Sequence, residues 1–180
     1  MVEIPCRFDP GYPYVDKFIT KVGIGVALLR KFEGRIQVLL GKRKGSHGEG
    51  EWAFPGGHME HLESFKETAY RELEEELGVF VKFDNLVTVS IINLTEYAPK
   101  HYIDVGMTAE WITGDPQVME PDKVEKWEWF NLSLNPEEDI TVHLPSPRFA
   151  TVDRVLDAAA NYLNEGVAIF DKVDKPATVV

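Results

Sequence analysis

The chain has 180 residues, a length that suits one globular domain. Hydrophobic residues make up 44% of it and charged residues 27%, which allows a sizeable core and excludes a wholly disordered chain. The formal net charge is −11, so broad electrostatic binding to DNA or RNA is disfavoured. A small phosphorylated ligand remains compatible with this charge, because a divalent cation held by carboxylates reverses the local sign.

Composition also bears on location. The longest apolar runs, such as residues 24–29, are far shorter than the roughly 20 residues that a membrane helix needs. The first residues lack a basic region followed by an apolar stretch, so we expect no secretory signal. The lone cysteine, Cys6, cannot form an internal disulfide, which favours a reducing compartment. We therefore expect a cytoplasmic protein with no membrane partner.

In chain order, residues 1–17 are rich in proline and aromatic side chains and are expected to form an irregular arm. A single domain should follow over residues 18–170, with a tail over 171–180. Apolar patterning predicts strands at 22–29, 35–40, 86–94, 102–112 and 127–130. Gly23 and Gly25 in the first strand indicate a close backbone approach. Residues 41–50 contain four glycines and are expected to form a basic, flexible loop.

Two helices complete the expected α/β layered sandwich. The first follows a break at residues 55–57. It should begin at Ser64, which forms a capping box with Glu67, and end at Gly78. Its buried stripe is expected to comprise Phe65, Ala69, Leu73 and Leu77. The second helix is expected from near residue 147 to 165, with Gly166 as its stop. Its apolar face would comprise Phe149, Val152, Val155, Leu156, Ala159 and Leu163.

The first predicted helix carries an unusual cluster of acidic residues. Glu72, Glu75 and Glu76 are spaced i, i+3 and i+4, so their carboxylates share one helical surface. Like charges this close are destabilising unless a cation lies among them. Several charged oxygen ligands suit Mg²⁺ or Mn²⁺ better than zinc. A solvated acidic face would be the ordinary alternative, but this cluster adjoins the apolar stripe and follows a Pro-Gly-Gly turn.

The residues around this cluster form a recognisable motif. Gly57 is followed after five residues by Glu63 and, after seven more, by the segment 71–79, RELEEELGV. This order matches the Nudix box, G-x5-E-x7-R-E-U-x-E-E-x-G-U, where U is a bulky aliphatic residue, without a departure. Residues 39–46, 54–60 and 127–129 are also similar to those of MutT-like nucleoside triphosphate diphosphatases. The resemblance covers roughly residues 20–165.

The resemblance implies the Nudix fold, an α/β/α sandwich around a mixed sheet, with Mg²⁺ as cofactor and Mn²⁺ as a possible substitute. It assigns Glu72, Glu75 and Glu76 to metal binding and catalysis, and the Gly57 carbonyl to the metal shell. The base is Glu72 or a more distant residue in different family members. Glu63 and Arg71 match positions that support the helix. We also expect substrate contacts from five residues: Lys42, Arg43, Phe54, Gly56 and Gly57.

The implied reaction is cleavage of nucleoside triphosphates, unmodified or oxidised as in 8-oxo-dGTP, to nucleoside monophosphate and pyrophosphate. Alternative substrates for the same machinery are an isoprenyl diphosphate, dihydroneopterin triphosphate or a nucleotide sugar. A non-catalytic nucleotide sensor is a further alternative, although such proteins commonly lack one of the box carboxylates. Relatives with these motifs are often homodimers. We expect a homodimer here, with the aromatic arm packed on its own domain or across a two-fold interface.

Overall fold

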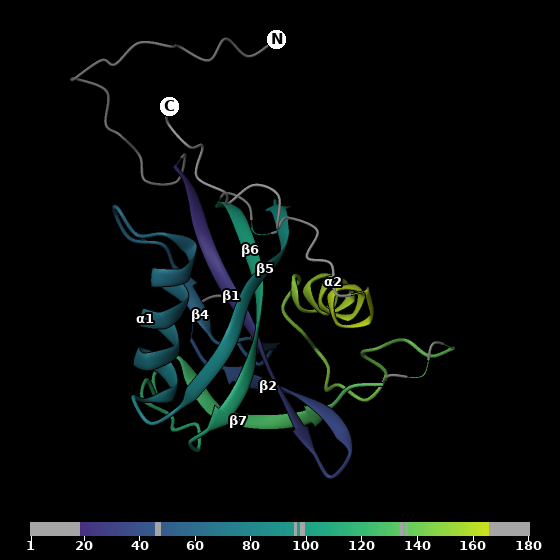
Figure 1. Ribbon diagram of the computed structural model, residues 1–180. Coiled ribbons are helices and arrows are strands. Elements are labelled where there is room, and N and C mark those ends of the chain that lie inside the picture. Colours follow the sequence, from purple (N-terminus) through teal and green to yellow (C-terminus); the bar gives the residue numbers. More distant parts are fainter. Residues whose placement is uncertain are drawn as a thin grey trace, which may run out of the picture.

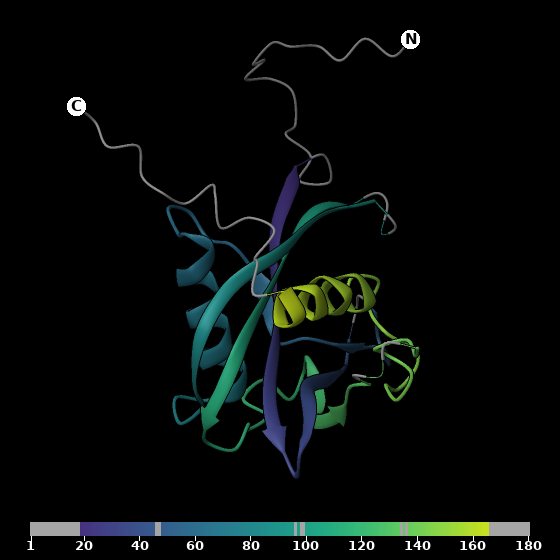
Figure 2. The same cartoon turned by 45° about the vertical axis from the view of Figure 1, so that its right-hand side comes forward.

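A computed structural model of the chain describes residues 19–45, 48–95, 97, 100–133, 135 and 137–165, with side chains in the last helix described through residue 161. One mixed sheet lies between two helices, which cover its opposite faces (Figures 1 and 2). This is the predicted α/β sandwich. The expected arm at 1–17 and tail at 171–180 lie outside the described residues. Neither described helix is long and apolar enough to cross a membrane.

Seven strands form the sheet: β1 (Thr20–Phe32), β2 (Arg35–Arg43), β3 (Trp52–Ala53), β4 (Gly56–His58), β5 (Lys82–Leu94), β6 (His101–Thr113) and β7 (Val124–Asn131). The main path through the sheet is β3-β2-β1-β6-β5. Central β1 runs parallel to β6 on one side, and on the other it pairs antiparallel with β4 at its start and with β2 at its end. β7 pairs with the other edge of β2.

Two segments differ from the sequence prediction near β4. The predicted loop at 41–50 begins later, because β2 continues to Arg43 and pairs with both β3 and β7 there. The predicted break at 55–57 is partly wrong, since Gly56 and Gly57 belong to β4. Gly56 has a φ of 149°, and a Cβ on it would lie 2.0 Å from the Ile24 carbonyl oxygen. Only glycine allows this close approach of β4 to β1.

Helix α1 (Phe65–Leu77) begins and ends as predicted. Ser64 and Glu67 form both hydrogen bonds of the capping box, and the Gly78 N–H donates to the Glu74 carbonyl. Three residues of the predicted stripe are buried: Ala69, Leu73 and Leu77. Phe65 is 37% exposed, so its assignment to the buried stripe was wrong. The side chains buried beside the stripe include Thr68, Glu72 and Glu76.

Helix α2 (Val152–Glu165) begins later than predicted. The preceding segment pairs with Trp52 instead: Trp52 N–H donates to the Pro147 carbonyl, and Phe149 N–H donates to the Trp52 carbonyl. These bonds hold residues 147–149 extended beside β3. Four residues of the predicted apolar face are fully or almost fully buried: Val152, Val155, Leu156 and Ala159. The side chain of Leu163 and the predicted stop at Gly166 lie outside the described part.

Candidate metal and phosphate site

The sheet brings β4 directly against the acidic surface of α1. The Gly56 N–H donates to Oε2 of Glu76 over 2.8 Å. At Gly57, a Cβ would lie 2.3 Å from Oε1 of Glu72. A side chain at Gly57 would therefore displace this carboxylate. The glycine pair lets two box glutamates pack against the backbone of β4, 15–20 residues earlier in the sequence.

Burial separates the three predicted catalytic glutamates. Glu72 and Glu76 are only 9% and 8% exposed, whereas the Glu75 side chain is 54% exposed. Desolvation raises the pKa of Glu76 to about 8, although the Gly56 hydrogen bond opposes this shift. Desolvation also raises the pKa of Glu72. A solvated acidic face therefore does not describe Glu72 and Glu76.

Arg71 connects the acidic helix to the turn that precedes it. Its Nε and Nη2 donate to the two carboxylate oxygens of Glu63 over 2.7 and 2.9 Å, a bidentate pair. Nη1 donates to Glu72 and Glu75 over 2.8 and 3.2 Å. Nη2 also donates to the His58 carbonyl over 2.9 Å. One guanidinium thus joins α1, β4 and the intervening turn, which agrees with the supporting role expected for Glu63 and Arg71.

These contacts have electrostatic consequences. The Arg71 hydrogen bonds, helped by the Glu60 N–H, lower the pKa of Glu63 to about 2. The same contacts raise the pKa of Arg71 above its usual value. Glu63 is therefore held as the anion that balances Arg71. By contrast, burial raises the pKa of Glu72 and of Glu76, so their surroundings disfavour the ionised form.

The donor groups at this site suit a hard divalent cation. Within the described ranges, no group of three or more His, Cys, Asp or Glu side chains is arranged so that it could hold a metal ion. Carboxylate oxygens of Glu72 and Glu76 instead accept hydrogen bonds from Arg71 and Gly56. Both groups are desolvated carboxylates, and a divalent cation would favour their ionised form. The residues present therefore fit Mg²⁺ or Mn²⁺.

The structure adds two residues that the sequence did not single out. After β6, residues 114–123 run along the end of α1, where the Met119 N–H donates to the Glu76 carbonyl over 3.3 Å. The charge of Glu120 helps to raise the pKa of Glu76, and Lys123 opposes it. Lys123 pairs with Glu120 over 2.7 Å. Glu120 lies outside the box and belongs to no local motif, so only the fold places it near the cluster.

The predicted substrate contacts separate into two groups. Gly56 and Gly57 lie against the carboxylates, as described above. Lys42 pairs with Glu125 of β7 over 3.1 Å. The Arg43 guanidinium lies 5.0 Å from the centre of the Phe149 ring. Phe54 is 8% exposed and belongs to the core that α2 covers. The structure thus joins only the two glycines directly to the acidic cluster.

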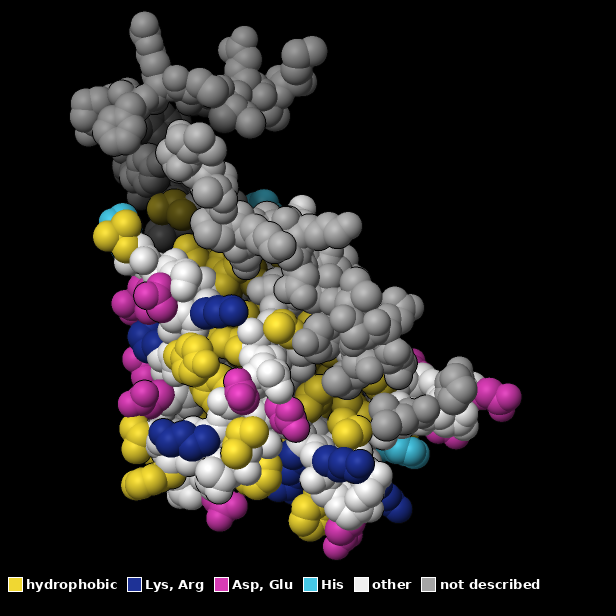
Figure 3. Space-filling model, in the orientation of Figure 1, with side chains coloured by type: hydrophobic (Ala, Val, Ile, Leu, Met, Phe, Trp, Pro, Cys, Tyr) yellow, Lys and Arg dark blue, Asp and Glu magenta, His cyan; other side chains and the backbone are white. Residues whose placement is uncertain are grey.

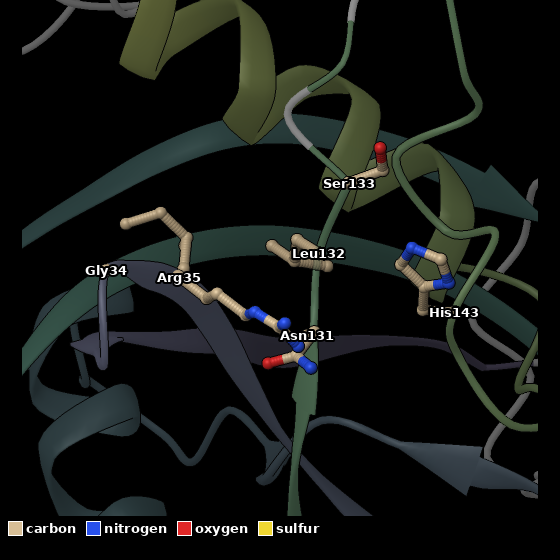
Figure 4. A pocket seen from close by; sticks show the side chains of 7 residues that line it. Gly34, Arg35, Asn131, Leu132, Ser133 and His143 are labelled. Atoms are coloured by element: carbon tan, nitrogen blue, oxygen red, sulfur yellow. The ribbon is translucent and has the colours of Figure 1, made fainter.

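The surface over α1 is mixed in charge. Acidic side chains lie along this side of the molecule with Lys and Arg among them (Figure 3). A separate cavity of about 470 Å³ lies at the turn between β1 and β2. Its lining residues are Gly34, Arg35, Ile36, Asn131, Leu132, Ser133 and His143 (Figure 4). None of these is a predicted site residue, so this cavity is distinct from the acidic cluster.

Comparisons with known proteins agree with this geometry. Residues 20–146 match the model of the NUDIX domain. The chain is 33% identical over 114 residues to an RNA pyrophosphohydrolase of Hamiltonella defensa subsp. Acyrthosiphon pisum, covering 63% of this chain and 60% of that protein. It is 32% identical over 105 residues to the oxidized purine nucleoside triphosphate hydrolase of Mus musculus, covering 58% and 64%.

Among solved structures, the MutT NUDIX hydrolase of Burkholderia pseudomallei is similar, with a TM-score of 0.64 and 29% identity. The match covers 78% of this chain and 98% of that one. The chain spans 60% and 64% of the length of the two curated relatives above. The family match extends over most of the chain and contains the whole acidic cluster. The chain therefore belongs to the NUDIX domain family.

Proposed function

We propose that the protein is a Mg²⁺-dependent hydrolase of phosphoric anhydride bonds. Its substrates would be nucleoside triphosphates, unmodified or oxidised, and its products the nucleoside monophosphate and pyrophosphate. The observation that carries this proposal is the pair of buried carboxylates, Glu72 and Glu76, packed against the backbone of Gly56 and Gly57. Relatives named for pyrophosphohydrolase and nucleoside triphosphate hydrolase activities support the reaction class.

Different residues of the chain would bind the cation, orient the carboxylates and accept the proton. Glu72, Glu75, Glu76 and the Gly57 carbonyl would hold the cation, which supplies positive charge opposite the phosphate oxygens when bound. Arg71 keeps the Glu72 and Glu75 carboxylates oriented on α1 through its hydrogen bonds. Glu72, or a more distant residue such as Glu120, would accept a proton from the attacking water. Lys42, Arg43 and Phe54 as substrate contacts, and Mn²⁺ as an alternative cation, remain predictions.

A second candidate substrate is the 5′ triphosphate end of RNA. The relative with 33% identity is named an RNA pyrophosphohydrolase, and the scissile bonds are of the same kind. The net charge of −11 weighs against extended contacts with an RNA chain. Free nucleotides are therefore the preferred proposal, and a 5′-triphosphorylated RNA belongs in the same assay.

The test is a hydrolysis panel with released pyrophosphate or phosphate measured with and without Mg²⁺. It includes the common and oxidised nucleoside triphosphates, triphosphorylated RNA, an isoprenyl diphosphate, dihydroneopterin triphosphate and a nucleotide sugar. We expect a nucleoside triphosphate to be turned over fastest. Absence of hydrolysis of every nucleoside triphosphate would refute the proposed substrate. Nucleotide binding without metal-dependent turnover of any substrate would favour a non-catalytic sensor.

A matched pair of variants tests the site itself. Glu76→Gln removes a buried carboxylate charge, and we expect turnover to fall about tenfold to a hundredfold, the scale seen when metal sites are disturbed. Glu74 occupies the free position of the box and is exposed, so Glu74→Gln should leave turnover almost unchanged. Equal losses in the two variants, or full activity in Glu76→Gln, would contradict the assignment.

Assembly and location are also proposals. We propose a homodimer, with the aromatic and apolar residues before residue 17 packed on their own domain or across a two-fold interface. Light scattering at micromolar concentration should give twice the 20.4 kDa chain mass, and a clean monomer mass would reject the dimer. The proposed cytoplasmic location rests on the lone cysteine and is tested by cell fractionation.

A further inference from the structure

The carboxylate of Asp104, which lies outside the Nudix box, has one oxygen without a hydrogen-bond donor among the described residues. Asp104 lies on β6 and pairs across the sheet with Gly23 of β1. Its side chain shares the α2 face with position 106, since alternate strand residues share a face and a Cβ on Gly106 would meet Val155 of α2. The Thr151 hydroxyl donates to the carboxylate, but the buried Oδ1 has no hydrogen-bond partner in the described part of the chain.

An ionised, half-satisfied carboxylate in this position is destabilising. Desolvation raises the pKa of Asp104 to about 6, and the Thr151 bond only partly offsets this effect. At neutral pH the carboxylate is mainly anionic, and its buried Oδ1 accepts no hydrogen bond from the residues that the structure describes. A bound molecule that supplies an N–H or O–H donor would remove this deficit.

Gly23 connects Asp104 to the proposed phosphate site. A Cβ on Gly23 would have two described atoms within 4 Å, Oδ2 of Asp104 at 3.6 Å and the Gly57 carbonyl oxygen at 3.9 Å. The Asp104 carboxylate and the Gly57 carbonyl therefore flank the same point on β1. This shared neighbour is the structural link between Asp104 and the proposed phosphate site.

Aromatic rings border this position. His58 on β4 pairs with Gly23, and its ring stacks on Tyr102 of β6 with ring centres 5.6 Å apart. Tyr102 lies two residues before Asp104, so the two side chains share a face. A second stacked pair, Tyr97 and Phe149, lies near the start of α2. Flat aromatic rings beside an acceptor suit a planar, N–H-bearing ring.

We propose that Asp104 determines base specificity by accepting a hydrogen bond at Oδ1 from an N–H donor of the substrate's nucleobase. This inference rests on the proposed function, because it requires a nucleotide in the site. The cation proposed at α1, rather than the Asp104 carboxylate, would attract the phosphate groups. Thr151 acts as a positioning residue, because its hydroxyl bonds the carboxylate and Oδ1 is left without a donor from the described part of the protein.

The test compares Asp104→Asn with Asp157→Asn, which removes an equal charge from an exposed position on α2. kcat/KM is measured for the four ribonucleoside triphosphates and their 2′-deoxy counterparts. An amide presents a donor as well as an acceptor, so Asp104→Asn should change the ratio of kcat/KM between the best base and another base at least tenfold. Asp157→Asn should change no ratio more than about twofold.

Three results would overturn the inference. One is an equal change for all bases, and another is an unchanged base preference in Asp104→Asn. The third is a change confined to the ratio of ribose to deoxyribose substrates, which would assign Oδ1 to a sugar hydroxyl. Thr151→Val, which keeps the carboxylate, should shift base preference in the same direction as Asp104→Asn but less. A shift in KM alone, equal for all bases, would give Thr151 a purely structural role and would contradict its positioning role.

Failure of the inference and failure of the proposed function are distinguishable. If the parent hydrolyses no nucleoside triphosphate, the proposed function fails. Calorimetric titration with the eight unphosphorylated nucleosides then tests Asp104 alone. Binding that favours one base and weakens at least tenfold in Asp104→Asn would support the inference, and absence of base-selective binding would refute it.

Discussion

The two helices pack on opposite faces of one sheet, but their interfaces differ in kind. Helix α2 buries apolar side chains against the sheet: Val152, Val155, Leu156 and Ala159. Helix α1 buries Leu73 and Leu77 in the same way, and beside them it buries Glu72 and Glu76. Packing and hydrophobic burial explain the contacts of these four α2 side chains. The α1 interface contains two carboxylates that apolar residues of similar size would replace at a gain in stability.

This difference separates what holds the fold together from what the fold presents to a ligand. The apolar residues of both helices should matter for stability alone. The glutamates of α1 should reduce stability and be needed for activity. The proposed cation would offset the destabilising effect of the buried glutamates, because its charge favours the ionised carboxylates.

The largest expected effects on stability come from the apolar side chains that both helices bury against the sheet. Leu73→Ala on α1 and Leu156→Ala on α2 each remove a buried leucine side chain and leave a cavity in its place. Each should reduce the free energy of unfolding by about 2–5 kcal/mol. Urea unfolding followed by circular dichroism measures both. A loss below about 1 kcal/mol in either variant would show that the corresponding helix does not pack as described.

The pH dependence of stability should distinguish the two interfaces. The pKa of Glu76 is about 8 in the folded protein, against 4.5 for an ordinary glutamate. The folded state therefore binds the proton more tightly than the unfolded state. This site's contribution to stability is fully present below pH 4.5 and is lost as pH rises through 8. The loss amounts to a few kcal/mol.

Other groups titrate over the same range, so the measurement needs a reference. Glu76→Gln cannot ionise at this position. Metal-free parent and Glu76→Gln are compared by urea unfolding at about pH 5 and about pH 8.5. The parent should lose more stability than the variant between these values. An equal loss would show that Glu76 ionises as freely in the folded protein as in the unfolded chain.

The smallest effect is expected at Arg43, which links β2 to the segment before α2. Its guanidinium lies over the Phe149 ring, a contact worth about 0.5–1 kcal/mol. Arg43→Ala should lower stability by that amount, and Arg43→Lys should recover part of it. KM for a nucleoside triphosphate is measured on the same variants. A KM rise of about tenfold or more would assign Arg43 to phosphate binding, the role predicted from the sequence. Loss of a charge-assisted hydrogen bond to phosphate weakens binding by about that factor.

Local signals in the sequence predicted much of this molecule. The Ser64–Glu67 capping box and Gly78 correctly bounded α1, and apolar patterning located the five long strands, although they extend beyond the predicted bounds. Glu63 and Arg71, to which the family resemblance gives supporting positions, form an ion pair. These features depend on residues close together in the chain, so they can be predicted without knowledge of the fold.

The remaining features depend on distant contacts. Phe65 fits the helical period, but it is the first residue of α1 and is 37% exposed. Residues 147–149 look helical by composition, but Trp52 supplies backbone partners that hold them extended. Glu120 and Asp104 belong to no motif. They become candidates only because residues 114–123 run along α1 and because β6 pairs with β1 at Gly23.

The buried glutamates of α1 are proposed to hold a divalent cation. The most direct measurement is the change in melting temperature on adding Mg²⁺ at about pH 8 to the parent, Glu76→Gln and Glu74→Gln. Without metal, Glu76→Gln should melt at or above the parent's temperature, because a buried charge has been removed. Mg²⁺ should raise the melting temperature of the parent and Glu74→Gln and have much less effect on Glu76→Gln. Equal Mg²⁺ shifts in all three proteins, or a metal-free Glu76→Gln less stable than the parent, would contradict the account.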